Sequence, residues 1–132
     1  MYYLLFVCEC REIEIKRLFK QIIVNNAALN ITSELYYTET HYMQYLEGDK
    51  KTIQNLFDII KRYQHNRNVQ FIADGDLEQR FAPNPCAYHY ISNQKLLQLD
   101  VNNLSEFCKH RMFTDIEKYL SPLKNLIAKT KT

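Results

Sequence analysis

The sequence predicts one α+β domain, in which a mixed sheet of about five strands is covered by helices. At 132 residues the chain can form one domain with a substantial core, but not two. Two segments, residues 12–26 and 49–64, repeat apolar residues at helical spacing. Five shorter runs have the aromatic and apolar composition of strands. With 46% hydrophobic and 24% charged residues, the composition is that of an ordinary globular protein rather than a disordered one.

Residues 2–10, YYLLFVCEC, form the first predicted strand. The run is too short for a core helix and is rich in aromatic and β-branched residues. Side chains alternate between the two faces of a strand, so one face carries Leu4, Phe6 and Cys8 and the other carries Tyr3, Leu5 and Val7. Both faces are apolar, so we expect both to be covered.

Residues 12–26 form the first predicted helix, with an apolar stripe made of Ile15, Leu18, Phe19, Ile22 and Ile23. We expect it to end near Asn25 and Asn26, because asparagine at a helix C-terminus can take the left-handed conformation.

Residues 33–38 and 41–48 predict a β-hairpin with its turn at Thr38–Thr40. Asp49 is the predicted N-cap of the second helix, whose apolar positions are Ile53, Leu56, Phe57 and Ile60. Residues 69–75 and 86–91 are the last two predicted strands, separated by a break at Pro83–Pro85.

This order, β-α-β-β-α-β-β, predicts a ferredoxin-like arrangement with two helices on one face of a mixed five-stranded sheet. Residues 102–129 predict one or two more helices, which would cover the other face. We expect a domain at residues 1–95 and a helical extension at 96–132 packed on the sheet. The apolar positions of the extension are Leu104, Phe107, Cys108, Ile116, Tyr119, Leu120, Leu123 and Leu126.

Charge, hydropathy and residue spacing exclude several functional classes. A formal net charge of +2 with mixed signs provides no field for nucleic acid. No apolar run approaches the ~20 residues of a membrane span, and residues 1–12 lack the basic n-region and small-residue cleavage site typical of a leader, so we expect a cytoplasmic protein. The four cysteines form no CxxC pair, which favours reduced thiols over a metal site. The four histidines are dispersed and no catalytic triad stands out, so an enzyme is the least supported class.

Gln44, in the run HYMQYLEG, is the residue that most needs an explanation. On the helix-covered face of its strand, an amide is costly unless its donors and acceptors are paired. Its partner could be another protein group, or a heteroaromatic ligand with alternating donors and acceptors along one edge. Asn25 and Asn26 could serve the same edge.

The stretch from NNAALNITSELYY to HYMQYLEGDKKTIQNLFDII resembles the BLUF domain, a flavin-binding blue-light sensor module. The family pattern is an Asn-Asn pair, then Ile-Thr-Gly, then Gln-x-Leu-Glu-Gly and an amphipathic helix. The matching residues are Asn25, Asn26, Ile31, Thr32, Gln44, Leu46, Glu47 and Gly48. The resemblance covers about residues 2–91 and leaves the C-terminal helices outside.

This resemblance implies a flavin, FAD or FMN, with its ring between the two helices above the sheet. By position, Asn25 and Asn26 would address the carbonyl and imide edge of the ring, and Gln44 a ring nitrogen and carbonyl. Leu18 and Ile60 would clamp the two ring faces.

The sequence departs from the family pattern where the light reaction takes place. In the family, a first-strand tyrosine passes an electron and a proton to the excited flavin, and the glutamine then rearranges. The matching residue here is Phe6, whose ring has no acidic hydroxyl. The family's Trp-Ser-Met segment, through which output partly runs, is replaced by Asn84, Pro85 and Cys86.

Other positions depart from the family pattern as well. Many members have an arginine and an aspartate on the second helix, where this sequence has Ile59 and Tyr63. The glycines that flank Ile-Thr in the family are Asn30 and Ser33 here. The loss of such contacts is expected to weaken flavin binding.

Three hypotheses follow. The first is a BLUF-like sensory domain that binds flavin but has lost or altered its photochemistry, with Gln44, Asn84 and Cys86 at signalling positions. The second is a flavin-free interaction module. The third keeps a light reaction through a substitute donor among Tyr42, Tyr88 and Tyr90. As in short family members, we expect a homo-oligomer that acts on a separate downstream signalling protein.

Overall fold

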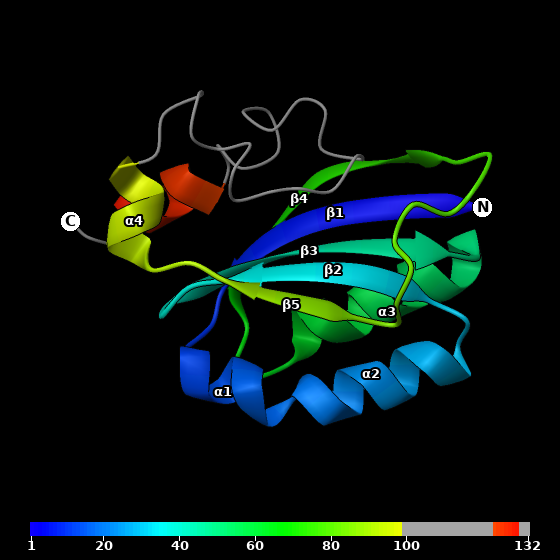
Figure 1. Ribbon diagram of the computed structural model, residues 1–132, viewed down its shortest axis with the longest axis horizontal. Helices are drawn as coiled ribbons and strands as arrows, with labels where there is room; N and C mark the ends of the chain where they lie inside the picture. The colour runs from blue at the N-terminus through cyan, green and yellow to red at the C-terminus, as the bar shows by residue number, and fades with distance from the viewer. Residues whose placement is uncertain (99–122, 130–132) are drawn as a thin grey trace.

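The computed structural model describes residues 1–98 and 123–129 (Figure 1). One five-stranded sheet has the order β4-β1-β3-β2-β5, and β5 is the strand that runs parallel to its neighbour, β2. The elements are β1 (Tyr2–Glu9), α1 (Glu12–Arg17), α2 (Phe19–Ala28), β2 (Thr32–Tyr37), β3 (His41–Gly48), α3 (Lys50–Arg62), β4 (Arg67–Asp76), β5 (Ala87–Tyr90) and α4 (Asn93–Gln98). Residues 123–129 are also helical, and the ferredoxin-like order predicted from the sequence is confirmed.

The sheet separates two hydrophobic layers. Helices α1, α2 and α3 cover one side, here called the α3 face, whereas α4 and residues 123–129 lie toward the other, the α4 face (Figure 1). Leu123, Leu126 and Ile127 pack into the α4-face core, as predicted for the first two. The other predicted positions of the extension, from Leu104 to Leu120, lie outside the described residues. Among the described helices, none has the length and apolar character needed to cross a membrane.

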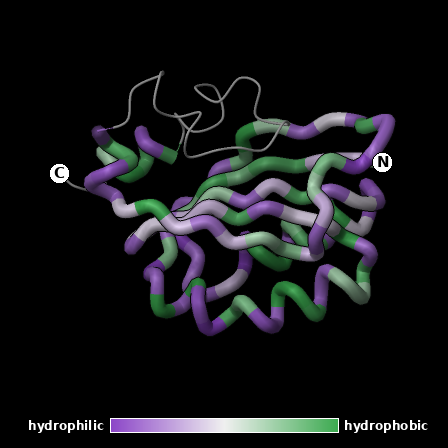
Figure 2. Tube along the Cα trace, in the orientation of Figure 1, coloured by the Kyte–Doolittle hydropathy of each residue, from purple (hydrophilic) through white to green (hydrophobic). Residues whose placement is uncertain are grey.

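Strand β1 is buried on both sides, as its pattern predicts. Phe6 and Cys8 belong to the core on the α3 face, and Leu5 and Val7 to the core on the α4 face; all four are fully buried. The apolar run of β1 is visible along the strand beside the edge strand β4 (Figure 2). All eight residues of β3, the central strand, are buried as well.

The first predicted helix is two helices rather than one. The break falls at Leu18, whose backbone N–H bonds to the Ile15 carbonyl at 3.1 Å, a spacing of three residues instead of four. The second part continues to Ala28, so the predicted end near Asn25 and Asn26 is wrong. Asn30 takes the left-handed conformation instead, with φ 56°.

Ile23 is 39% exposed and does not belong to the buried stripe that its spacing predicts. The second helix agrees with its prediction more closely. The Asp49 carboxylate accepts a hydrogen bond from the Thr52 backbone N–H at 3.1 Å, and Ile53 and Phe57 are buried. Helix α4 was not predicted, although the Ser92 hydroxyl, which accepts from the Lys95 N–H, is an N-cap signal.

Candidate functional site

Gln44 lies in the middle of a row of side chains that crosses the whole sheet on the α3 face. Phe6 of β1 pairs with Gln44 of β3 on one side and with Phe71 of β4 on the other. Leu35 of β2 pairs with Gln44 and with Tyr88 of β5. Directly opposed residues in a sheet share a face. Gln44 is therefore the one amide in a row that is otherwise apolar or aromatic.

No hydrogen bond joins the Gln44 side chain to the described residues, and Gln44 is only 4% exposed. Its amide atoms are not fully enclosed, because the fully buried side-chain atoms without a partner in the described residues are His41 Nε2 and Asn93 Oδ1. Its neighbour Phe6 is fully buried, and the Phe6 ring centroid lies 5.7 Å from that of Tyr42 and 5.2 Å from that of Phe57. Aromatic rings do not satisfy an amide, and buried polar groups are almost always paired. The Gln44 amide therefore has donors and acceptors to offer a ligand.

The two adjacent asparagines have different environments. Asn26 is 2% exposed, and its Nδ2 donates to Ser33 Oγ at 3.2 Å and to the Pro85 carbonyl at 2.8 Å. Asn25 is exposed, and its Oδ1 accepts from Gln21 one turn earlier. Consecutive helical residues point about 100° apart, so only one member of such a pair faces the sheet.

The Asn26 contacts join α2 to β2 and to the segment that leads into β5. The Ser33 hydroxyl donates to the Pro85 carbonyl at 2.7 Å, and the Ser33 N–H donates to the Asn84 carbonyl at 3.0 Å. Asn84 is exposed, whereas Cys86 is buried in the core of the α3 face. Burial raises the pKa of the Cys86 thiol to about 11, so the thiol stays protonated at neutral pH and is a weak nucleophile.

The two predicted ring clamps are both half-buried. Leu18 lies at the junction of α1 and α2, and Ile60 packs from α3 against the core of the α3 face. Of the two positions where the family pattern has charged residues, Ile59 is 58% exposed and Tyr63 follows the last turn of α3.

Two tyrosines near Gln44, Tyr42 and Tyr88, donate their hydroxyl hydrogen bonds to groups that are poor bases. The Tyr42 hydroxyl donates to Asn66 Oδ1 at 3.2 Å, and the Tyr88 hydroxyl donates to the Phe19 carbonyl at 2.7 Å. Burial raises the pKa of Tyr42 and of Tyr88 well above the usual value for tyrosine. An amide or peptide carbonyl does not take a proton at neutral pH, so neither of these acceptors can receive the hydroxyl proton.

Tyr90 differs, because its hydroxyl donates to the Glu39 carboxylate at 2.9 Å, and this hydrogen bond raises the pKa of Tyr90 to about 12. However, Tyr90 is 48% exposed and pairs with Tyr37, outside the row that contains Gln44.

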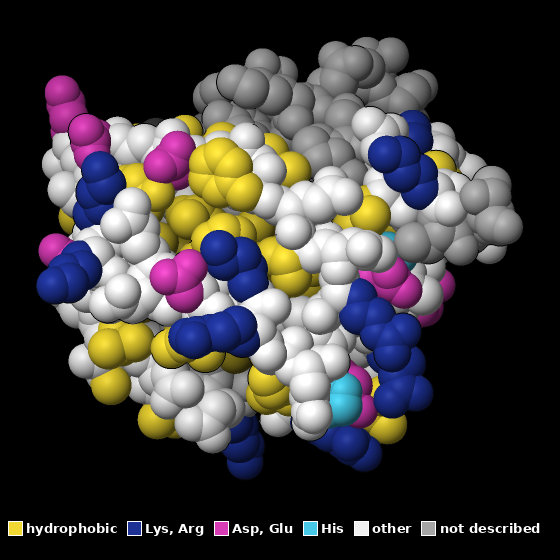
Figure 3. Space-filling view, turned by 180° about the vertical axis from the view of Figure 1, so that it is seen from behind, with side chains coloured by type: hydrophobic (Ala, Val, Ile, Leu, Met, Phe, Trp, Pro, Cys, Tyr) yellow, Lys and Arg dark blue, Asp and Glu magenta, His cyan; other side chains and the backbone are white. Residues whose placement is uncertain are grey.

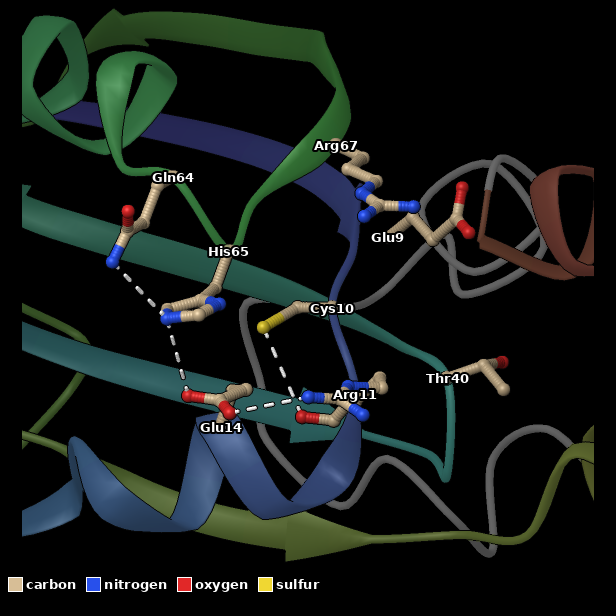
Figure 4. Close-up of a pocket in the computed structure, with 8 residues that line it drawn as sticks. All are labelled: Glu9, Cys10, Arg11, Glu14, Thr40, Gln64, His65 and Arg67. Carbon is tan, nitrogen blue, oxygen red and sulfur yellow. Dashed lines mark hydrogen bonds and ion pairs between the residues drawn. The ribbon is translucent and has the colours of Figure 1, made fainter.

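A polar cavity of about 310 Å³ opens at the end of the sheet where β1, α1 and the α3–β4 connection meet (Figure 4). Within it, the Glu14 carboxylate is nearly buried and lies 3.4 Å from Arg11 and 3.5 Å from His65. The lining residues are Glu9, Cys10, Arg11, Glu14, Thr40, Gln64, His65 and Arg67. Because carboxylates and cations alternate around it, the cavity has no strong charge of one sign. In the described parts of the chain, no group of three or more His, Cys, Asp or Glu side chains is placed to hold a metal.

Glu47 matches the family pattern, but the sequence predicts no role for it near Gln44. It is fully buried, and its carboxylate accepts from the backbone N–H groups of Phe81 and Ala82 at 2.9 and 2.7 Å. A glutamate at an inward position of a buried strand could have signalled this role.

Comparisons with known proteins identify the family. The sequence profile of BLUF, described as sensors of blue-light using FAD, matches residues 1–84, which is 84 of 132 residues. No match was found among curated protein sequences.

Solved structures share the fold. BlrB, a BLUF protein in its dark state, superposes with a TM-score of 0.67 at 19% identity, over 97% of this chain and 96% of BlrB. The photo-activated state of BlsA gives 0.66 at 17% identity, over 82% and 91%. A bacterial light-regulated adenylyl cyclase gives 0.65 at 22% identity, over 99% of this chain but 34% of the cyclase.

The profile match covers more than half of the chain and includes Asn26, Phe6 and Gln44, while the structural matches reproduce the order of strands and helices. The chain therefore belongs to the BLUF family of blue-light sensors that use FAD.

Proposed function

We propose that this BLUF domain binds a flavin over the α3 face and that its response to light is lost or altered, because Phe6 stands where the light reaction needs a tyrosine. The observation that carries the proposal is the buried Gln44 amide, which has no partner within the described residues and lies directly across from Phe6.

The residues present fit such a ligand. A flavin absorbs blue light and presents a ring edge on which hydrogen-bond donors and acceptors alternate. Gln44 and Asn26 would address that edge, and Leu18 and Ile60 would hold the ring faces. Asn25 is the weakest candidate of the set, since its exposed side chain is engaged with Gln21.

Altered photochemistry is supported because no tyrosine in the described residues beside Gln44 donates its hydroxyl to a proton acceptor. Phe6 has no hydroxyl, and the hydroxyls of Tyr42 and Tyr88 donate to groups that do not accept a proton. These contacts argue against the hypothesis that Tyr42 or Tyr88 substitutes for the missing tyrosine. Because the Phe6 ring has no hydroxyl, Gln44 would also lack a phenolic partner.

A flavin-free interaction module is the second candidate. It is favoured because protein contacts already engage polar and aromatic side chains on the α3 face. The Asn26 amide nitrogen has two protein acceptors, and Phe19 stacks on Tyr88 with ring centroids 3.7 Å apart. If such contacts fill the ring space, Gln44 remains a buried amide without a function.

We also propose that residues 1–95 form the sensory unit and that residues 96–132 form an extension on the α4 face, where Leu123 and Leu126 pack. A sensory rather than catalytic role, a cytoplasmic location and a separate downstream protein complete the proposal. Self-association is supported by the hydrophobic side chains gathered on the side seen in Figure 3, bordered by charged groups. Ile59 and Phe71 are each more than half exposed.

The visible absorption spectrum of protein purified from a flavin-rich host, before and during blue illumination, tests the main proposal. A structured flavin band without the usual red shift is the expected result. A flat spectrum that stays flat after FAD or FMN is added would reject flavin binding and favour the interaction module. A full, reversible red shift would reject altered photochemistry. The variant Gln44→Leu serves as the control for binding through the amide.

A further inference from the structure

Glu47 lies three residues after Gln44 on the same strand, and its side chain points to the opposite face of the sheet. Its carboxylate is fully buried. Besides the Phe81 and Ala82 N–H groups, it accepts a hydrogen bond from the Tyr45 hydroxyl at 3.0 Å. The strand that carries the Gln44 amide on the α3 face thus carries a buried carboxyl group on the α4 face.

A buried carboxylate is retained in a fold only where its hydrogen bonds offset its loss of hydration. Two of the donors here are backbone groups, and charge-assisted bonds to backbone N–H groups are among the stronger ones in proteins. They fix the chain at residues 81–82, in the connection between β4 and β5. Arg80 adds to this, since its guanidinium donates to the Asn30 carbonyl at 2.7 Å and to Thr32 Oγ1 at 2.8 Å.

The segment held by Glu47 is also part of the opposite core. Ala82 is 1% exposed and belongs to the α4-face cluster together with Leu5, Leu96 and Leu123. Glu47 therefore connects the strand of Gln44 to the layer formed by α4 and residues 123–129. Among the described residues, this carboxylate is the group on β3 that bonds the backbone of the β4–β5 connection.

We propose that Glu47 is the positioning residue that carries a change at Gln44 to the α4 face, by holding residues 81–82 against β3. Every residue of β3 is buried, so a shift of the strand at Gln44 has no solvent-exposed position at which to relax before it reaches Glu47. Movement of Glu47 then moves Ala82 and the helices packed on it. The trigger at Gln44 rests on the proposed function, whereas the attachment of residues 81–82 to Glu47 does not.

Residue-resolved amide exchange measured by NMR on the full chain tests the attachment. In Glu47→Gln the side chain keeps its length, but one acceptor oxygen becomes an NH2 group facing the two N–H donors. The amides of Phe81 and Ala82 are expected to exchange about tenfold faster, while those of Phe6 and Leu46 stay unchanged. Tyr45→Phe is the matched control, because it removes one donor to the same carboxylate and leaves the two backbone bonds. Equal acceleration at all four amides would mean general destabilisation and would overturn the proposal.

The coupling is tested by adding FMN to the wild-type protein and to Glu47→Gln. In the wild type, FMN is expected to change exchange at Phe81 and Ala82 by about threefold or more; in the variant it should bind with similar affinity but leave these two amides unchanged. FMN binding to the wild type without any change at residues 81–82 would overturn this inference alone. Failure of FMN and FAD to bind the wild type would overturn the proposed function and the coupling together. If Glu47→Gln does not fold, the absence of an FMN effect at Phe81 and Ala82 in the wild type still overturns the coupling.

Discussion

Phe6 and Gln44 lie opposite each other on β1 and β3, at the centre of the sheet and beneath the helices of the α3 face. Phe6 is a fully buried ring and Gln44 is a buried amide, and the Phe6 ring gives the amide no hydrogen-bond partner. Under the proposed function, the pair holds both the amide that favours a ligand and the ring that would limit a light reaction. Four predictions follow from this pair and its surroundings.

Gln44→Leu is expected to change the stability of the ligand-free protein by less than about 1 kcal/mol, because the Gln44 amide has no hydrogen bond to lose among the described residues and its atoms are not fully enclosed. The same change should weaken FMN binding by about tenfold. Urea denaturation and fluorescence titration measure the two effects. Gln70→Leu is the control, since Gln70 is exposed on β4 and its change should leave both quantities nearly unaltered. A Gln44→Leu protein destabilised by more than about 1 kcal/mol would mean that the amide is already paired.

Phe6→Tyr places a phenolic hydroxyl beside Gln44 and is expected to introduce quenching of flavin fluorescence and a light-induced red shift in the flavin-loaded protein. Phe57→Tyr provides the comparison, because the Phe57 ring lies 5.2 Å from Phe6 but projects from α3 instead of from the strand. Fluorescence lifetimes and difference spectra under blue light record the result. If Phe6→Tyr binds flavin yet behaves like the wild type, the missing tyrosine is not what limits the light response.

Asn26→Ala is expected to lower the free energy of unfolding by about 1–3 kcal/mol, because Ser33 and Pro85 lose the amide that joins them to α2. Asn25→Ala should change it by less than ~0.5 kcal/mol, since its side chain is exposed. Both variants gain the same helix propensity from alanine, so their difference isolates the buried contacts. Chemical denaturation in the ligand-free state measures this difference, and equal effects would contradict the geometry.

Acidification is expected to destabilise the fold through His41. Burial lowers the pKa of His41, which is 1% exposed, and the nearby Glu9 opposes this only in part. The unfolded chain therefore takes up a proton near the ordinary value of about 6.5, while the folded chain resists it to lower pH. Stability is present above that value and is lost as the pH falls through it toward the folded pKa.

Urea denaturation of the wild type and of His41→Gln at pH 7.5 and 5.5 isolates this contribution. The wild type should lose more stability on acidification than the variant, at most about 1.4 kcal/mol for each unit by which the two pKa values differ. Identical losses in the two proteins would exclude His41 as a source of the pH dependence.

Much of the fold could be predicted because its signals are local. The two apolar faces of β1 and the N-cap at Asp49 can each be recognised in a few consecutive residues. The break at Leu18 could not, because residues 12–28 contain no glycine or proline and every residue tolerates a helix. Contacts made later in the chain decide it, with Ile15 in the core and Phe19 stacked on Tyr88.

The positions of the candidate residues were predictable to the same extent. Gln44 and Asn26 are buried, which the strand pattern and the family resemblance favoured. Asn25 is turned away by the geometry of a helix, a conclusion that the sequence alone would have allowed. The partners of Glu47 could not be foreseen, because they are backbone groups 34 and 35 residues farther along the chain. Backbone groups are present at every position, so no side-chain pattern marks them.

The strand order also determines how the site must assemble during folding. Strands β2 and β3 form a hairpin closed by the Thr38–His41 backbone bond of 2.8 Å, and such local hairpins form within about 1–10 μs. Strand β1 pairs with β3 and β4, so its docking must close loops of several tens of residues and is the slower step. Gln44 is thus held in an early hairpin, and Phe6 reaches it only when β1 docks. Mutations in β1 should therefore slow folding more than mutations in β5, a strand at the sheet edge.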